Sequence, residues 1–580
     1  MDNSFLEELK QEEQQIKEQK PKYEDIPKNY TINNNELCRL VPKKQGGEVV
    51  GYSEIPLSRE IPRIQSSMSD IENDDSYHIL EFENMRKGEK REIQVPTKTI
   101  SHARELVELS AKGVSVNSNN ATHLVEYFDR YQAELDVKHR KIVTRLGHIK
   151  GRFVHPSMPS DFEIITTEAE YKKIVESMKP EGTLKDYQEH VFNRIKDSDT
   201  ALFMFFSALS SMLCEEYKIE PFIVDLSGQT SIGKTALLRA VATIYGQYDN
   251  LVMTWDTTEI NVNRRAVFMN SFPLLIDDTQ KAKYKNLVSN VTYQFSSGQE
   301  RGRTNLTGIE ETKQWRNVMI STGENSITSF GDNKGGQAAR TITVERTPFD
   351  IDPGDTTFFK ELYKGIENYH GTLATAFYKQ FTSNKKYYSR AFEDFEHDFR
   401  TRKDNDVMQR LGRLFAVVKV AGLVLDEIEG FENDYDRVCD AIFKDMAENN
   451  KSVDKPREVL DNVLAELDAK RAYLISKENN YERGEMIGGI KPEFVGILPA
   501  YLNKELGHEK NAIIKEWKKR GWLVVDNSGK GFQKSVKIGG TTRKMYCIQS
   551  FITRELGYDF QTGVTGRDIP TSDEHTATRI

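Results

Sequence analysis

Cysteine and long apolar runs are both scarce in this sequence. The four cysteines among 580 residues lie far apart and form no CxxC pair. We therefore expect neither a disulfide framework nor a structural zinc site, and a reducing cytoplasmic compartment is the default location. No run approaches the roughly 18 apolar residues of a membrane span, and residues 1–35 contain no apolar segment typical of a secretory signal. We expect no membrane partner.

Positive charge is also in short supply over the whole chain. The formal net charge is −8 and 29% of the residues are charged, a composition typical of a globular protein with polar surfaces and not of a collagen-like or disordered chain. Taken alone, the acidic balance argues against a nucleic-acid partner. Residues 510–545 reverse that inference, because ten Lys and Arg side chains face only two acidic ones there. The net charge of the whole chain therefore conceals a basic segment within an otherwise acidic protein.

The length predicts several domains, because domains run to about 100–200 residues each. Strands and helices alternate through the middle of the chain, which favours an α/β core built on a parallel sheet. The predicted segments are a charged flexible arm (1–35), an N-terminal α+β domain (36–156), the α/β core (157–354), a helical region (355–475), a winged-helix domain (482–555) and a flexible tail (556–580).

Local patterns predict several individual elements. Residues 78–84 and 91–97 alternate like paired strands, and residues 120–135 form an amphipathic helix with Asn120 as candidate cap. The polar stretch 63–77 is predicted to be a loop. In the last domain, residues 493–507 and 510–522 are predicted to be two helices, followed by a strand and a hairpin.

The strongest local signal is a phosphate-binding loop. The pattern G-x-x-x-x-G-K-[ST] lies between an apolar strand (222–226) and a helix (236–244). Backbone N–H groups of such a loop and the helix N-terminus bind phosphate, the lysine neutralises the β- and γ-phosphates of ATP, and the hydroxyl binds Mg²⁺. The predicted nucleotide-binding residues are Gly228, Gln229, Thr230, Ser231, Ile232, Gly233, Lys234 and Thr235.

A second strand, 272–276, ends in Asp277 and Asp278. We predict that Asp277 holds Mg²⁺ through water, at the ion that the Thr235 hydroxyl binds, and that Asp278 is the general base that polarises the attacking water. The alternative is a strand that ends in a solvated acidic turn.

A third strand, 317–321, ends in Thr322, Glu324 and Asn325. In hydrolytic P-loop folds a strand between the previous two ends in a polar residue that senses the γ-phosphate, so these three side chains are candidates for that role. The alternative is a helix cap or a turn.

Two arginines are candidates for contacts with the nucleotide. Arg340 directly precedes a strand (341–344), from which it could reach the phosphate of a neighbouring subunit as an arginine finger. Arg410 lies on the polar side of an apolar helix and could close over the nucleotide. A surface salt bridge for Arg340 and a solvated position for Arg410 are the alternatives.

Two basic segments are candidates for DNA contacts. Residues 296–315 suggest a hairpin whose basic tip would grip a phosphate backbone, or else a purely structural loop. In the winged helix the second helix would enter a major groove and the wing would lie on the backbone, unless this face binds protein. The predicted contacts are Arg301, Arg303, Lys313, Lys515, Lys518, Lys519, Arg520, Lys534 and Lys537.

The ordered set GQTSIGKT, LLIDD, QWRNVMISTGE and GGQAARTITV resembles the ATPase core of the AAA+ class. It is similar to the MCM-like and superfamily III helicases of plasmids and phages, and to the replication-initiation helicase of staphylococcal cassette chromosomes. The resemblance covers about residues 78–470. It implies a hexameric ring around DNA, ATP and Mg²⁺ bound between subunits, Arg340 acting in trans and Arg410 as a second sensor.

The sequence departs from this family at two places. The acidic strand ends in Asp-Asp where many relatives have Asp-Glu, which shortens the reach of the general base. The third strand lacks an Asn directly at its end, so Thr322, Glu324 and Asn325 compete for the sensor role.

Together these features predict an ATP-dependent DNA helicase that forms a hexameric ring and starts replication of a mobile genetic element. Its partners would be single-stranded DNA and origin duplex, with a primase or another replication protein as a further candidate. One alternative is an origin-binding initiator or loader that uses ATP as an assembly switch without unwinding. Another is an AAA+ remodeller of proteins.

Overall fold

The computed structural model describes residues 25–166, 168–229, 232–300, 304–305, 308–309, 312–330, 339–352, 354–402, 406–449, 454–476, 486–507, 510–526, 531–538 and 540–560. The chain divides into two compact units. The first comprises Met1–Phe330, Val344–Glu396 and Leu414–Cys439, and the second Gly331–Thr343, His397–Arg413 and Asp440–Ile580.

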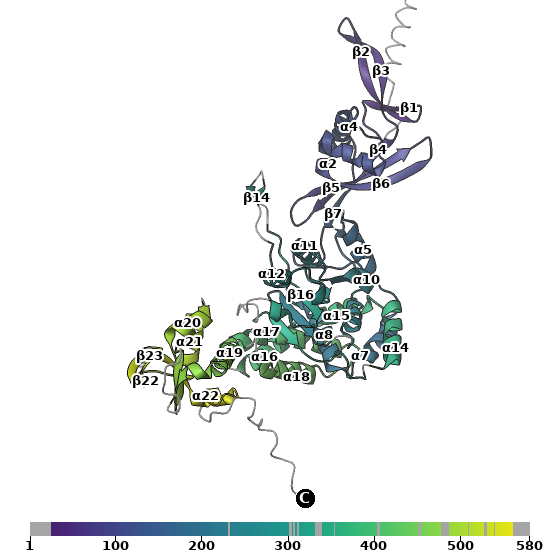
Figure 1. The fold of residues 1–580 in the computed structure, drawn as a ribbon. Coiled ribbons are helices and arrows are strands. Elements are labelled where there is room, and N and C mark those ends of the chain that lie inside the picture. Colours follow the sequence, from purple (N-terminus) through teal and green to yellow (C-terminus); the bar gives the residue numbers. More distant parts are fainter. Residues whose placement is uncertain are drawn as a thin grey trace, which may run out of the picture. The chain divides into compact units, whose positions relative to one another are not determined.

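The N-terminal part of the first unit contains two small sheets, and its β2–β3 hairpin projects away from the sheet that includes β4, β5 and β6 (Figure 1). One sheet is antiparallel, in the order β1-β2-β3, and the other is mixed, in the order β10-β7-β4-β5-β6. The elements are β1 (Tyr30–Asn33), β2 (Glu36–Gln45), β3 (Glu48–Ser58), β4 (Ile61–Asp70), β5 (Ser76–Asn84), β6 (Glu89–Pro96), α2 (Thr97–Ser101), α3 (Ala103–Val107), η1 (Glu108–Lys112), α4 (Ala121–Glu134), β7 (His139–Val143) and β10 (Glu163–Ile164).

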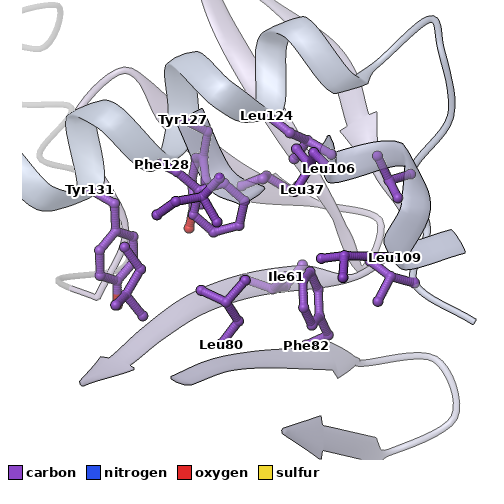
Figure 2. Packing of buried hydrophobic residues seen from close by; sticks show 14 of the residues in the cluster. Leu37, Ile61, Leu80, Phe82, Leu106, Leu109, Leu124, Tyr127, Phe128 and Tyr131 are labelled. Atoms are coloured by element: carbon purple, nitrogen blue, oxygen red, sulfur yellow. The ribbon is translucent and has the colours of Figure 1, made fainter. Parts of the chain in front are cut away.

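Strand and helix side chains share one apolar core in this part of the chain. Figure 2 shows Leu80 and Phe82 of β5 facing the aromatic side chains of α4. Tyr127 is fully buried, and its hydroxyl donates to the carbonyl of Pro62 at 2.6 Å. Burial of such aromatic side chains dominates the stability of a small core, so α4 is fixed against the sheet along its apolar face.

The predicted pair of strands at 78–84 and 91–97 is confirmed, because β5 and β6 pair antiparallel. The predicted helix at 120–135 is also confirmed as α4. Asn120 precedes this helix without capping it, because its side-chain oxygen accepts from the backbone N–H of Asn117 at 2.7 Å while its amide donates to the carbonyls of Leu57 and Ser115. The flexible arm was predicted to include residues 1–35, but the last part of this range contains the strand β1.

The loop predicted for residues 63–77 is wrong. Most of it is β4, which lies between β5 and β7 and forms backbone pairs with both. Ser66, Met68 and Asp70 of this strand are buried. Strand propensity depends strongly on context, and pairing on two sides with an apolar core outweighs the weak preference of Ser and Asp for strands.

A short hairpin, β8 (Gly147–Ile149) and β9 (Arg152–Val154), attaches to the chain before the core strand that carries Asp277. The side-chain amide of Asn270 donates to the carbonyls of Leu146 and His148 at 3.0 and 2.9 Å. Gly147 has a φ of +78°, and a Cβ added there would lie 2.7 Å from the backbone nitrogen of Ser271. Only glycine allows the two segments to approach this closely.

The core of the first unit is a sheet with the strand order β12-β13-β16-β11, and β17, whose residues 341–343 belong to the second unit, follows β11 in this order (Figure 1). The pairs β12–β13, β13–β16 and β16–β11 are parallel, as predicted for an α/β core. The strands are β11 (Phe222–Ser227), β12 (Val252–Thr254), β13 (Leu274–Asp277), β16 (Val318–Gly323) and β17 (Thr341–Val344).

Helices and short turns surround this sheet. The helix α8 is buried along nearly its whole length, in agreement with the apolar run from which it forms. The elements are α5 (Ala169–Ser177), α6 (Leu184–Tyr187), η2 (Gln188–Phe192), α7 (Asn193–Ile195), α8 (Asp199–Ser210), η3 (Ser211–Leu213), α9 (Lys234–Ala242), α10 (Tyr248–Leu251), α11 (Glu259–Met269), η4 (Thr279–Lys281), α12 (Lys285–Phe295), η5 (Ile327–Phe330), α14 (Thr356–Asn368) and α15 (Thr372–Ser383).

The region predicted to be helical from residue 355 onward consists of helices in the structure. After α14 and α15 it continues with α16 (Lys385–Thr401), α17 (Asp406–Asp426), α18 (Tyr435–Asn449) and α19 (Lys455–Ala469). The hairpin predicted within 296–315 is present as the antiparallel pair β14 (Thr304–Asn305) and β15 (Gly308–Ile309).

The C-terminal part of the second unit has its own sheet and core. The sheet has the order β18-β19-β20-β23-β21, and β22 pairs with β23. Trp517 is fully buried, and its indole donates to the carbonyl of Pro456 at 2.7 Å. The elements are η7 (Arg471–Tyr473), β18 (Leu474–Ile475), β19 (Gly488–Lys491), β20 (Phe494–Ile497), α20 (Pro499–Leu506), α21 (Lys510–Lys519), β21 (Leu523–Val524), β22 (Lys534–Ile538), β23 (Thr541–Gln549) and α22 (Ser550–Glu555).

The predicted order of helix, helix, strand and hairpin is present from α20 to β23, with one correction. The helix predicted from residue 493 begins at Pro499, because residues 494–497 form β20 between β19 and β23. Proline is favoured at the first helical position, so it marks the true start. Within the predicted tail, Phe560 packs into the core of this unit.

The four cysteines are buried and free. Among the residues that the structure describes, no helix combines the length and apolarity needed to cross a membrane.

We expect Asn270→Ala to lower the free energy of unfolding by about 2–4 kcal/mol, because it leaves two largely buried carbonyl groups without their donor. Urea denaturation measures this loss. The matched control is Asn368→Ala, whose exposed amide donates to a single carbonyl on α14 and whose loss should cost less than about 0.5 kcal/mol. Equal effects of the two substitutions would show that the Asn270 amide does not anchor the hairpin.

Candidate functional site

A cavity of about 420 Å³ lies where β11, β13 and β16 end and α9 begins. In parallel sheets the carboxyl ends of the strands form the usual ligand site. Lining residues come from four separate segments of the first unit: Gly233, Lys234, Thr235, Ala236, Asp277, Asp278, Thr322, Gly323, Glu324, Phe359 and Tyr363.

The glycine-rich loop leads directly into α9. Gly233 has a φ of +99° and the helix begins at Lys234, so the loop turns in a conformation that favours glycine. The Lys234 ammonium donates to the carbonyls of Gly228 and Gln229 at 2.8 and 2.6 Å. Partial burial lowers the pKa of Lys234. Thr230 and Ser231 of the predicted loop lie outside the described residues.

The carboxylate of Asp277 is the meeting point of three elements. It accepts a hydrogen bond of 2.6 Å from the hydroxyl of Thr322, and both its oxygens lie 3.2 Å from the hydroxyl of Thr235. The backbone N–H of Asp278 donates to the same Thr322 oxygen at 3.1 Å. The structure therefore brings together the ends of β13 and β16 and the start of α9.

The third predicted strand lies where the sequence placed it, because β16 pairs with β11 on one side and β13 on the other. Of its three candidate side chains, Thr322 bonds to Asp277 and Glu324 lines the cavity. Asn325 is not among the described lining residues. Thr322 and Glu324 therefore both lie at the cavity, and the γ-phosphate sensor role stays a prediction.

Asp278 has an unusual backbone conformation for a residue other than glycine, with a φ of +65°. Its carboxylate accepts from the backbone N–H of Gln280 at 3.2 Å and lies 3.5 Å from the Lys281 ammonium. Residues held in sparsely populated conformations are frequent at functional sites. The side chain that was predicted as general base lines the cavity in this conformation.

Charge in the cavity is unbalanced. One ammonium group, that of Lys234, is accompanied by the carboxylates of Asp277, Asp278 and Glu324. Such a set attracts cations, and carboxylate and hydroxyl oxygens are the ligands that Mg²⁺ prefers. An anionic ligand would need a divalent cation to offset the carboxylates.

Two aromatic residues of the site escaped prediction. Phe359 and Tyr363 line the cavity from α14, more than 120 residues after the glycine-rich loop. Their four-residue spacing places both rings on one helix face. This spacing is the only feature of the sequence that could have indicated their place in the site. A periodic aromatic pair is usually read as core.

The predicted arginines lie outside this lining. Arg340 directly precedes β17, and Arg410 is an exposed residue of α17. Both belong to the second unit, whereas all described lining residues belong to the first. Their roles toward a nucleotide stay predictions.

The predicted DNA contacts fall into three groups. Arg301 and Arg303 lie outside the described residues, and Lys313 is exposed after β15. The lysines of α21 and β22 that were predicted as contacts are exposed or half-buried: Lys515, Lys518, Lys519, Lys534 and Lys537.

Arg520 is engaged within the protein. Its guanidinium donates to both oxygens of Asp454 at 2.7 Å and to Glu516 at 2.9 Å, and it lies 4.9 Å from the centroid of the Trp522 ring. A bidentate pair of this kind fixes the side chain. Arg520 therefore holds α21 to the residue before α19, and its prediction as a DNA contact is not supported by this geometry.

The strand that leads into the glycine-rich loop carries a buried acid. Asp225 of β11 is fully buried, and its carboxyl group accepts a 2.8 Å hydrogen bond from the backbone N–H of Ile327. Desolvation raises the pKa of Asp225 to about 7 because burial disfavours the charged form.

The family model described as "Domain of unknown function (DUF927)" matches residues 37–315. Among solved structures, one described as "SCCmec type IV Cch - active helicase" superposes with a TM-score of 0.67 at 16% sequence identity, covering 91% of this chain and 99% of that chain. The apo C-terminal region of NrS-1 covers 83% of this chain and 95% of that one at 12% identity, and its TM-score of 0.28 supports no argument. The search of curated proteins gave no match.

At 16% identity the first of these structures establishes a shared fold and nothing more specific. The resemblance inferred from the ATPase motifs is thereby confirmed at the level of the fold, over most of the chain. The mixed α/β architecture with a parallel core sheet agrees with it.

We expect the contribution of Asp225 to stability to fall as pH rises from about 4 to about 7, while buried His148 and His155, whose pKa values burial lowers to about 4, contribute in the opposite direction. Over this range the unfolded chain releases the Asp225 proton while the folded protein, with a pKa of about 7, retains it. Asp225→Asn should remove this contribution and leave those of the histidines, so the urea midpoint of the variant should rise relative to that of the wild type as pH increases over the same range. An identical pH dependence in the two proteins would mean that Asp225 ionises normally in the fold.

Proposed function

We propose that this protein is an ATP-dependent DNA helicase with an AAA+ core, which assembles as a hexameric ring and starts replication of a mobile genetic element. The observation that carries the proposal is the joining of Lys234, Thr235, Asp277 and Thr322 around one cavity. The fold shared with a structure described as an active helicase supports the choice of a nucleic-acid motor. The mobile-element role rests on the motif resemblance.

The residues of the cavity fit ATP and Mg²⁺. The Thr235 hydroxyl and the Asp277 carboxylate, 3.2 Å apart, would hold Mg²⁺, which would supply positive charge to offset the local carboxylates and the phosphates. Lys234 would exchange the loop carbonyls that it now contacts for the β- and γ-phosphates. Asp278 would orient and deprotonate the attacking water, and Thr322 would keep the Asp277 carboxylate in place.

Assembly would complete the site. In the proposed ring Arg340 reaches the nucleotide of a neighbouring subunit, and Arg410 acts as a second sensor arginine. Both assignments rest on the resemblance to AAA+ helicases.

DNA would be bound by two modules. The hairpin β14–β15 would bind single strands, with Arg301, Arg303 and Lys313 as contacts. The C-terminal part would act as a winged helix on origin duplex through Lys515, Lys518, Lys519, Lys534 and Lys537. A primase partner and a cytoplasmic location remain predictions.

The decisive experiment is strand displacement from a forked DNA duplex together with ATP hydrolysis, using the full chain. Lys234→Ala should reduce both activities by about a hundredfold or more, because it removes the cation that neutralises the transferred phosphate. Lys360→Ala, an exposed lysine of α14, is the matched control and should retain both.

The same assay separates the alternatives. A wild-type protein that hydrolyses ATP without displacing a strand would be an initiator or loader. Hydrolysis indifferent to single-stranded DNA would instead indicate a protein remodeller. Unwinding that persists in Lys234→Ala would refute the mechanism.

We further expect the double variant Lys515→Ala/Lys519→Ala to weaken DNA binding and to lower the slope of log affinity against log salt by about two, since each phosphate contact contributes about one. Fluorescence anisotropy over a salt series measures both quantities. Lys172→Ala/Lys173→Ala, two exposed lysines of α5, removes the same charge and should leave the slope unchanged. An unaltered slope in the first variant would assign the basic face to a protein partner.

A further inference from the structure

We propose that Phe359 and Tyr363 form a base-binding shelf, on which the nucleobase of a purine nucleoside triphosphate stacks. The inference deepens the proposed function, since it rests on the cavity being a nucleotide site. It assigns to α14 the selection of the ligand, a task that none of the sequence motifs covers.

The shelf is built from one helix face. Phe359 and Tyr363 are one turn apart on α14, both line the cavity, and both are only partly buried. The two neighbouring phenylalanines behave differently: Phe349 is buried in the core, and Phe358 does not line the cavity. Two partly exposed aromatic side chains thus line a polar site.

Phe359 lies directly against the glycine-rich loop. A Cβ added to Gly233 would be 3.0 Å from two carbon atoms of its ring. Phe349 and Phe358 meet the same ring edge-on, with centroids 5.9 and 5.3 Å away. These contacts fix the ring, so little side-chain entropy would be lost when a ligand stacks on it.

Tyr363 is supported by a cation from the helix of the glycine-rich loop. The guanidinium carbon of Arg239 lies 5.8 Å from the centroid of the Tyr363 ring and 5.0 Å from that of Tyr248. An arginine over an aromatic face is attracted by the ring quadrupole. Arg239 is therefore a positioning residue, which couples the shelf to α9.

The cavity is lined by two chemically distinct sets of side chains. Lys234, Asp277, Asp278 and Glu324 contribute charged groups to the lining, and Phe359 and Tyr363 contribute aromatic rings. A nucleoside triphosphate bound with Mg²⁺ has two corresponding parts, a charged tail and a planar base. Matching the two places the base on α14.

Stacking explains the expected selectivity. The described lining residues include no Asn or Gln, the side chains that read base edges with paired hydrogen bonds. Stacking on an aromatic ring tolerates any base, and the larger purine ring gains more contact than a pyrimidine. The shelf should thus favour ATP and GTP alike over CTP and UTP.

The test compares ligands with and without a base. Binding of ATP and of inorganic tripolyphosphate, each with Mg²⁺, is measured by titration calorimetry on the full chain. Phe359→Leu/Tyr363→Leu should bind ATP about tenfold more weakly and tripolyphosphate within twofold of the wild type. Tyr387→Leu, a change of the same chemistry at an exposed aromatic residue of α16 that does not line the cavity, is the control and should alter neither.

Nucleotide preference provides a second readout. Wild-type protein should bind ATP and GTP within about threefold of each other and CTP about tenfold more weakly, and the double variant should lose this difference. Equal weakening of ATP and tripolyphosphate in the double variant, or CTP binding as tight as ATP in the wild type, would overturn the shelf while leaving the phosphate site intact. Undiminished binding of both ligands by Lys234→Ala would overturn the nucleotide site itself, and the shelf with it.

Discussion

The hydrogen bond from Thr322 to Asp277 joins the ends of two neighbouring strands, and the Thr235 hydroxyl approaches the same carboxylate from the start of α9. An almost buried carboxylate is costly unless polar groups surround it. Here the two hydroxyls come from elements that meet only if β16 lies between β11 and β13. Strand order and carboxylate position therefore depend on each other, and the cavity, its lysine and its aromatic wall are arranged around that point.

Much of the core was predictable because its signals are continuous in sequence. The loop from Gly228 to Thr235, the acidic end of β13 and the polar end of β16 are each encoded within about ten residues. Parallel strands bring their carboxyl ends to one edge of the sheet. The proximity of Lys234, Asp277 and Thr322 could therefore be predicted from the sequence alone. The β5–β6 hairpin and α4 followed from periodicity for the same reason.

Other features depend on contacts between distant segments. In the sequence Arg520 looks like one of several solvent-exposed basic residues of a helix. Its ion-pair partner, Asp454, lies 66 residues earlier and cannot be identified from the local sequence. β4 is rich in serine and became a strand because it is paired on both sides. Phe359 and Tyr363 have the spacing of ordinary core residues. No local pattern distinguishes a ring that faces a cavity from one that faces a core.

The excess of carboxylates over ammonium groups in the cavity has a consequence for how a cell would control this protein. If the ligand is a nucleotide, three acidic groups beside a single lysine disfavour the free anion and favour its magnesium complex. Occupancy would then follow the product of two concentrations. The site would then stay largely empty when either the nucleotide or the divalent metal is scarce.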